Sequence, residues 1–139
     1  MKKIHICLIY DSVSNIDNFE KQIENFDNLN ENLKQYFEIF AINKTNKSLD
    51  KFKIEIYNDD IINIIDSKWI VILSSDCILQ TLSYINLYKK TICTSDLENS
   101  IYYLHNNSNN IHYHNSYLIK KTNYRFVNKK NLTSEYLNV

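Results

Sequence analysis

The sequence of 139 residues contains no glycine and no proline. Glycine-rich loops that bring the backbone close to phosphate, such as the Walker loop and the dinucleotide-binding fingerprint, are therefore excluded. Any turn that needs a positive φ has to use asparagine or aspartate, which tolerate the left-handed region better than most residues. Asparagine is abundant enough for this purpose, with 21 copies.

Cysteines are few, and long apolar runs are absent. Cys7, Cys77 and Cys93 are odd in number and lie in or beside apolar segments, which predicts buried, reduced thiols rather than a disulfide framework. No window approaches the roughly 20 apolar residues of a membrane span. The apolar run that follows Lys3 stops at Asp11, which is too short for a signal peptide. These features predict a cytoplasmic protein.

Charge is balanced overall but unevenly distributed. The net charge is zero, while residues 111–139 carry 5 basic side chains and 1 acidic side chain.

The length, with 44% hydrophobic residues, predicts a single domain spanning residues 1–139. The neutral total charge and the lone arginine make nucleic acid an unlikely partner.

Apolar runs alternate with helical patterns along the chain. We expect helices at about 18–33, at 61–65 and directly after residues 74–76, where Ser75 or Asp76 would cap the helix and Ile78, Leu82 and Ile85 would share a face. This order predicts an α/β fold with a mainly parallel, mixed sheet flanked by helices, which is the architecture of a Rossmann-like nucleotide-binding domain. The expected strands are 4–10, 37–42, 52–57, 69–73, 101–104 and 111–119.

Polar residues follow three of these strands at the point where each strand stops. Tyr10 and Asp11 end the first strand, Asn43 ends the second, and residues 74–76 follow the strand at 69–73. In open α/β sheets, ligands bind at the carboxyl ends of the strands. We therefore expect these groups to converge on one crevice.

The same segments resemble the inverting family-2 glycosyltransferases, which have the GT-A fold. Residues 4–11 look like the opening strand of that family, and residues 38–43 look like its second strand. Residues 69–76 resemble the strand that leads into the DXD motif. The similarity covers about residues 4–90 and implies a truncated GT-A domain.

This resemblance implies a nucleotide sugar as ligand and, in an active enzyme, transfer of the sugar to an acceptor. Tyr10, Asp11, Asn43 and Ser74 would contact the nucleotide. Asp76 matches the last aspartate of the motif and would hold a divalent cation, Mg²⁺ or Mn²⁺, against the diphosphate.

Several positions depart from the family pattern. Ser74 stands where the motif has its first carboxylate, and Asn43 replaces the aspartate expected at the nucleotide site. The resemblance also implies a catalytic base in a later acidic pair, for which Glu135 is the candidate, as the only acid after Glu98. The incomplete motif favours a degenerate member, or pseudoenzyme, over an intact enzyme.

Each candidate residue also has a simpler interpretation. Asp76 can cap the helix after its strand, and Glu135 can be a solvated acid near the chain end. His112 and His114, at i and i+2, can share a metal, but no cysteine or paired carboxylate with suitable spacing accompanies them. We therefore do not predict a zinc site.

Two further functions remain open. The missing acidic residues favour a non-catalytic factor that binds a protein partner on an α/β scaffold. The tail at 113–130 interleaves tyrosines with basic residues, which is a pattern of single-stranded nucleic-acid binding and also of an aromatic edge strand.

Overall fold

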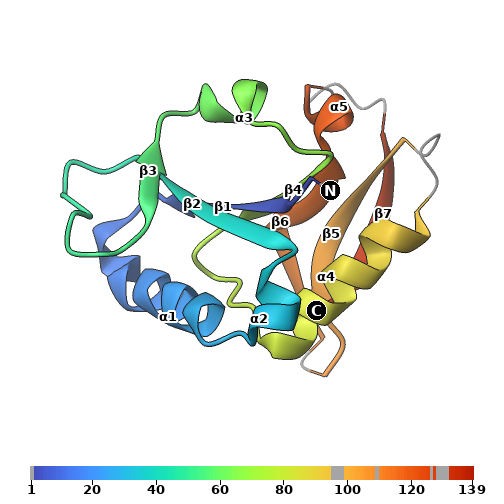
Figure 1. The fold of residues 1–139 in the computed structure, drawn as a ribbon, viewed down its shortest axis with the longest axis horizontal. Coiled ribbons are helices and arrows are strands. Elements are labelled where there is room, and N and C mark those ends of the chain that lie inside the picture. The colour runs from blue at the N-terminus through green and yellow to red at the C-terminus, as the bar shows by residue number, and fades with distance from the viewer. Residues whose placement is uncertain (1, 95–98, 109, 126, 128–131) are drawn as a thin grey trace.

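A computed structural model describes residues 2–94, 99–108, 110–125, 127 and 132–139. Seven strands form one mixed sheet with helices on both faces (Figure 1). The predicted α/β fold with a mainly parallel sheet is confirmed. Within the described ranges, every helix is too short or too polar to cross a lipid bilayer.

Pairing in the sheet follows from the lengths of the connections. The strands lie in the order β3-β2-β1-β4-β6-β5-β7, and β6 runs opposite to the other described strands. A short hairpin joins β5 to β6 and forces that antiparallel pair, whereas residues 11–36, which include helices, join β1 to β2 and allow these two strands to pair in parallel. The strands are β1 (Ile4–Tyr10), β2 (Phe37–Asn43), β3 (Glu55–Tyr57), β4 (Trp69–Leu73), β5 (Ser100–Asn106), β6 (Ile111–Lys120) and β7 (Thr133–Asn138).

Helices cover the two faces of the sheet unequally (Figure 1). Three of them, α1 (Ile16–Asp27), α2 (Glu31–Lys34) and α4 (Thr81–Cys93), lie on one face, which we call the major face. On the opposite, minor face lie the one-turn helices α3 (Ile61–Ile64) and α5 (Lys121–Tyr124). A short 3-10 helix, η1 (Val13–Asn15), leads into α1.

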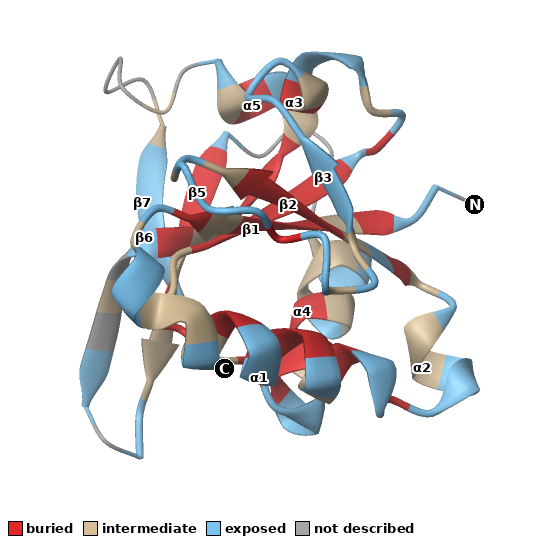
Figure 2. Cartoon of the chain, turned by 90° about the vertical axis from the view of Figure 1, so that its left-hand side faces the viewer, coloured by how far each residue is buried: buried red, intermediate tan, exposed pale blue. Residues whose placement is uncertain are grey.

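Burial follows this layering. All five residues of β4 are buried, as expected for a central strand with both faces covered. Figure 2 shows the central strands buried and both edge strands, β3 and β7, exposed. The major-face core is the larger cluster, and a smaller cluster around Ile62, Ile70 and Ile72 lies under α3.

Asparagine takes the place that glycine usually has in the β5–β6 turn. Asn110 has a φ of 51°, and it is the one described residue with a positive φ. The sequence-based expectation that asparagine or aspartate would serve such turns is confirmed at this position.

Two predicted elements are shorter than expected. The helix predicted at 18–33 is two helices, because Asn30 adopts an extended backbone and its side chain accepts a hydrogen bond from the Leu33 N–H, which starts α2 anew. The strand predicted at 52–57 is confined to Glu55–Tyr57. In both segments the apolar pattern extends beyond the element that forms, so the predicted element was too long.

The helix predicted after Ser74, Ser75 and Asp76 is present, but its predicted start and cap are wrong. Residues 74–80 form a non-helical connection, and α4 begins at Thr81, where Gln80 and Ser83 cap each other through reciprocal hydrogen bonds. The predicted apolar face is also wrong, because Leu82 is 63% exposed, while Tyr84 is buried against the sheet.

Side-chain amides of α1 and of the residue just before it explain why this connection is not helical. We call Asn15, Asn18, Gln22 and Asn25 the amide ladder, because they repeat at helical spacing and all bind the 74–80 connection. Their bonds go to backbone or hydroxyl groups of residues 75, 77 and 79 and are 2.7 to 3.1 Å long. A connection held in this way has no need of a helical hydrogen-bond pattern.

Gln22 is the buried member of the ladder, at 3% exposure. Its Nε2 donates to the Cys77 carbonyl at 2.9 Å, and its Oε1 accepts from the Leu79 N–H at 2.9 Å. One side chain thus satisfies two backbone groups beneath the tip of β4.

Replacing Gln22 by alanine should therefore destabilise the fold strongly. Gln22→Ala leaves the Cys77 carbonyl and the Leu79 N–H without partners, and we expect the free energy of unfolding to fall by about 2–4 kcal/mol. Urea unfolding measures this change. Glu20→Ala, at an exposed position of the same helix, is the control and should change the value by less than about 0.5 kcal/mol. A loss below about 1 kcal/mol for Gln22→Ala would show that water replaces the amide.

Candidate functional site

Three predicted site residues come together where β1, β2 and β4 end, and we call this carboxyl-end side of the sheet its strand-tip edge. Tyr10 is the register partner of Asn43, and the Lys44 N–H donates to the Tyr10 carbonyl at 2.8 Å. Leu8 is the partner of Leu73, so Ser74 starts just beyond the pairing of β1 with β4. The chain leaves β1 for β2 on one side and returns as β4 on the other, which makes this edge a topological switch point.

Asp76 lies beside two hydroxyl groups at this edge. The Ser74 Oγ donates to the Asp76 Oδ1 and lies 2.9 Å from the Ser116 Oγ of β6. Ser116 is fully buried and also accepts a bond from the Ser74 N–H at 2.9 Å. Strand β6 therefore fixes the turn that carries Asp76, while the Asp76 side chain stays exposed.

The simpler interpretation of Asp76 as a helix cap is wrong. The residue that caps α4 is Gln80, four positions further along the chain. Asp76 thus does not serve a helix end, and its carboxylate is oriented by Ser74 instead.

The neighbouring predicted residues have structural partners. The Tyr10 ring is buried against Phe19, with centroids 5.2 Å apart, so it supports the site rather than facing solvent. The Asn43 side chain organises its own loop, because its Nδ2 donates to the Lys47 carbonyl at 2.7 Å and its Oδ1 accepts from the Thr45 N–H at 2.9 Å. Asp11 is exposed beside them.

The space between the tips of β1 and β4 is closed on the major face. A cavity there holds about 10 Å³, which is about the minimum that one water molecule requires. Asn18, Phe19 and Gln22 line it together with the strand ends. A ligand of the switch point must therefore approach from outside the edge or from the minor face.

Glu135 lies away from this edge group. It is an exposed residue of β7, opposite Tyr102 in the register, and β6 and β5 stand between β7 and β4. At about 4.8 Å per strand, β7 is about 14 Å from β4 across the sheet. The structure thus brings Glu135 to neither Asp76 nor Ser74, and its role as a base stays a prediction.

The candidate histidine pair and the basic tail are described only in part. The side chains of His112 and His114, and the tail residues Lys129 and Lys130, lie outside the described part of the chain. Among described residues, no group of three histidine, cysteine, aspartate or glutamate side chains is placed to hold a metal ion.

The cysteines differ in accessibility. Cys7 and Cys77 are buried, and burial raises the pKa of each thiol from 9.0 to about 12. Cys93 is exposed, so its predicted burial is wrong. It lies at the last turn of α4, on the side away from the buried face of that helix.

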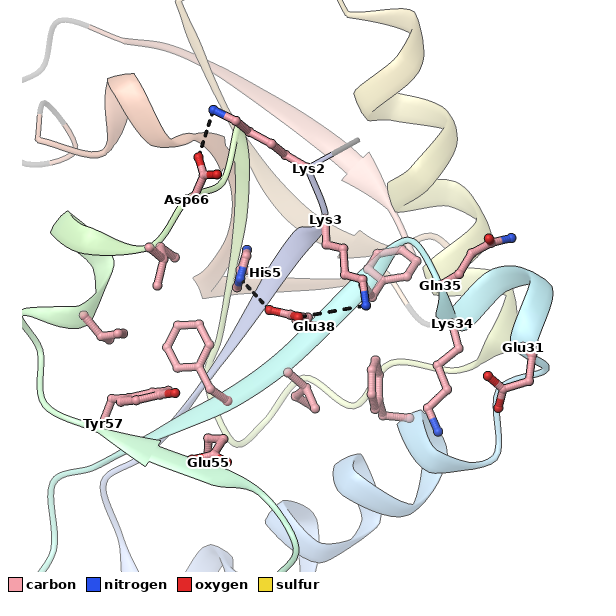
Figure 3. A pocket seen from close by; sticks show the side chains of 16 residues that line it. Lys2, Lys3, His5, Glu31, Lys34, Gln35, Glu38, Glu55, Tyr57 and Asp66 are labelled. Atoms are coloured by element: carbon pink, nitrogen blue, oxygen red, sulfur yellow. Dashed lines mark ion pairs between the residues drawn. The ribbon is translucent and has the colours of Figure 1, made fainter.

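One feature that the sequence reasoning missed is a groove along β2 with a volume of about 1220 Å³ (Figure 3). It lies at the opposite ends of the strands from Asp76, around the starts of β1 and β2. His5 Nε2 lies 2.9 Å from Glu38 Oε2, and Lys2 Nζ lies 2.9 Å from Asp66 Oδ1 (Figure 3). The groove is open because the short strand β3 pairs only with residues 40–42 and leaves the first half of β2 uncovered.

The backbone of β2 is partly unpaired in this groove. The Ile4 N–H donates to the Tyr36 carbonyl, so the backbone groups of Phe37 and Ile39 point away from β1. Pairing with β3 begins at Phe40, so the Ile39 N–H and both backbone groups of Phe37 lie outside that ladder. This stretch is an open sheet edge.

No protein-family model matches the chain, and a search of curated proteins gives no match.

Thiol accessibility can be checked directly. In the native protein near pH 8, we expect one thiol, that of Cys93, to react rapidly with a thiol reagent, and all three to react after unfolding. Cys93→Ser should remove the fast reaction, whereas Cys7→Ala should leave it unchanged. Two or three fast-reacting thiols in the folded wild type would contradict the burial of Cys7 and Cys77.

Proposed function

We propose that the chain is a glycosyltransferase-like domain that binds a nucleotide sugar at the switch point between β1 and β4. The observation that carries the proposal is the exposed carboxylate of Asp76, held by Ser74 at the tip of a buried central strand. Ligands of open α/β sheets bind outside the carboxyl ends of the strands, where the strand order reverses.

The cation site in this proposal is shared with the ligand. Mg²⁺ is commonly bound through one or two carboxylates together with substrate phosphates, so a group of three protein ligands is not required. Asp11 follows the last residue of β1, and Asp76 lies three residues beyond the end of β4, the strand that pairs with β1. The diphosphate would complete the coordination of a cation held by these two exposed carboxylates.

The site is better suited to binding a nucleotide sugar than to transferring the sugar. An acceptor hydroxyl needs a base within hydrogen-bond reach, and Glu135 is three strands away from β4. We therefore propose a degenerate member of the family, in which the nucleotide site is kept and sugar transfer is lost or slow.

Calorimetry with nucleotide sugars tests this function. We expect uridine or guanosine diphosphate sugars to bind with an affinity that depends on Mn²⁺. Asp76→Asn keeps the shape of the side chain and removes its charge, so it should weaken Mn²⁺-dependent binding by tenfold or more, which corresponds to about 1.4 kcal/mol.

The control for this substitution is Glu20→Gln, which removes one exposed carboxylate from α1. It should leave the affinity within twofold of the wild-type value. Absence of any Mn²⁺-dependent binding across the panel of nucleotide sugars would refute the proposal.

A second function, binding of a protein partner without catalysis, is favoured by the open edge of β2. An extended peptide can add a strand to such an edge through main-chain hydrogen bonds. The partner in this case is an unfolded or extended segment that pairs with residues 37–39 and crosses the groove of Figure 3.

Ile39→Pro tests strand addition, because it removes an N–H that lies outside the β2–β3 ladder. Peptides selected by display against the wild type should lose at least tenfold in affinity for Ile39→Pro. They should bind Ile39→Val, which keeps the N–H, and Asp76→Asn equally well. Unchanged binding to a folded Ile39→Pro variant, checked by circular dichroism, would exclude this mode.

A further inference from the structure

Three tyrosines surround a cavity of about 570 Å³ on the minor face. Tyr103 comes from β5, Tyr117 from β6 and Tyr124 from α5. Asn115 and Arg125 add polar groups to the lining. The volume falls within the range of about 300–1,000 Å³ that is usual for small-molecule sites. We call it the tyrosine cavity.

The sheet register explains how residues from distant parts of the chain meet there. Tyr117 is the partner of both Ile72 on β4 and Tyr103 on β5, so the three side chains stand side by side across the sheet. Helix α5 follows β6 directly and carries Tyr124 onto the same face, where Tyr117 and Tyr124 pack against the minor-face cluster.

Two of the rings in this cavity, those of Tyr103 and Tyr117, do not stack in parallel. Tyr103 and Tyr117 meet at 71° with centroids 6.0 Å apart, which is an edge contact. Elsewhere in the protein, Tyr36 and Tyr88 stack at 29° and 4.2 Å and so occupy each other's faces. Tyr103 also meets Tyr136 of β7 at 40° with centroids 6.2 Å apart, and tilted contacts of this kind leave ring surface on which another aromatic ring can stack.

The hydroxyl groups of Tyr117 and Tyr124 remain protonated at neutral pH. Burial raises the pKa of Tyr117 and of Tyr124 above the ordinary value of 10.0. Each hydroxyl can therefore donate as well as accept a hydrogen bond, and the Asn115 amide offers the same pair of functions. A ligand with both donors and acceptors on a flat ring fits these groups better than a plain hydrocarbon.

The tyrosine cavity adjoins the edge that carries Asp76. Asn115 precedes Ser116 in β6, so its side chain lies on the opposite face of the sheet from the Ser116 hydroxyl, which is 2.9 Å from the Ser74 Oγ; Ser74 in turn binds Asp76. Ile72 lies two residues before Ser74 on β4 and lines the cavity. The cavity on the major-face side of the strand tips holds only about 10 Å³, whereas the tyrosine cavity on the minor face holds about 570 Å³.

We propose that the tyrosine cavity receives the heteroaromatic base of the nucleotide whose diphosphate binds at Asp76. This inference rests on the proposed function. Stacking of a base on an aromatic side chain stabilises binding by about 1–3 kcal/mol. The positive charge of Arg125 at the rim suits a ligand that carries phosphate.

Nucleosides without phosphate separate the base site from the diphosphate site. Uridine, cytidine, adenosine and guanosine are titrated in the absence of metal and followed by NMR. We expect at least one to bind, with intermolecular nuclear Overhauser effects between base protons and the rings of Tyr117 or Tyr124. Tyr124→Ala should weaken this binding about tenfold, as expected for the loss of one stacking partner, while Tyr124→Phe should stay within threefold.

Two further variants serve as controls for misfolding and for indirect effects of the Tyr124 substitutions. Asn115 is exposed, so Asn115→Ala keeps the fold and should weaken binding of the preferred nucleoside by threefold or more. Tyr57→Ala removes an exposed tyrosine of β3, which is remote from the cavity, and should have no effect on that binding. Unchanged nucleoside affinity in both Tyr124→Ala and Asn115→Ala would overturn the inference.

The outcomes distinguish this inference from the proposed function. Mn²⁺-dependent binding of a nucleotide sugar without base contacts to the tyrosines would refute the base site and leave the Asp76 site standing. Nucleoside contacts to the tyrosines in Asp76→Asn, at wild-type affinity, would support the base site independently of the cation.

Discussion

The hydrogen bonds between the amide ladder of α1 and the connection after β4 determine much of this structure. They satisfy backbone groups that a helix would otherwise satisfy, so α4 begins only at Thr81. This delay has two consequences for the site. Asp76 is released from a capping role, and the gap between β1 and β4 is closed on the major face. The same few side chains thus decide both what the strand tips expose and from which side a ligand can reach them.

A chain without glycine has to build close approaches with side chains instead of bare backbone. In glycine-rich folds the turn after the first strand brings main-chain N–H groups to a phosphate. Here the strand tips are shaped by carboxamides and hydroxyls: Asn43 closes the loop after β2, Ser116 holds the turn after β4, and Asn110 takes the positive φ of the hairpin. Phosphate recognition at such an edge depends on side chains and a cation rather than on a cradle of N–H groups.

The local pattern of apolar residues was sufficient to predict the central strands of the sheet. It was insufficient for elements whose position depends on contacts with segments distant in the sequence. The bounds predicted for β1 and β4 are confirmed, because unbroken apolar runs of that length have few alternatives to a buried strand. The position of α4 depends on Gln22, which lies 55 residues before Cys77, and no local signal marks that contact. Likewise, the edge position of Tyr10, Asn43 and Ser74 was predictable from strand ends, whereas the inward orientation of the Tyr10 ring and the groove beside β2 were not.

The two faces of the sheet have different roles for a physical reason. Long helices on the major face bury most of the apolar side chains and leave little room, which makes that face the stabilising one. On the minor face, two helices of one turn each cover the centre of the sheet, and the tyrosine cavity lies beside α5, whereas the groove along β2 is lined from both faces, by α2 as well as by α3. A ligand site in the tyrosine cavity and a strand-pairing site at β2 would engage different strands of the sheet. The two candidate functions are therefore compatible in one molecule, because neither uses the residues of the other.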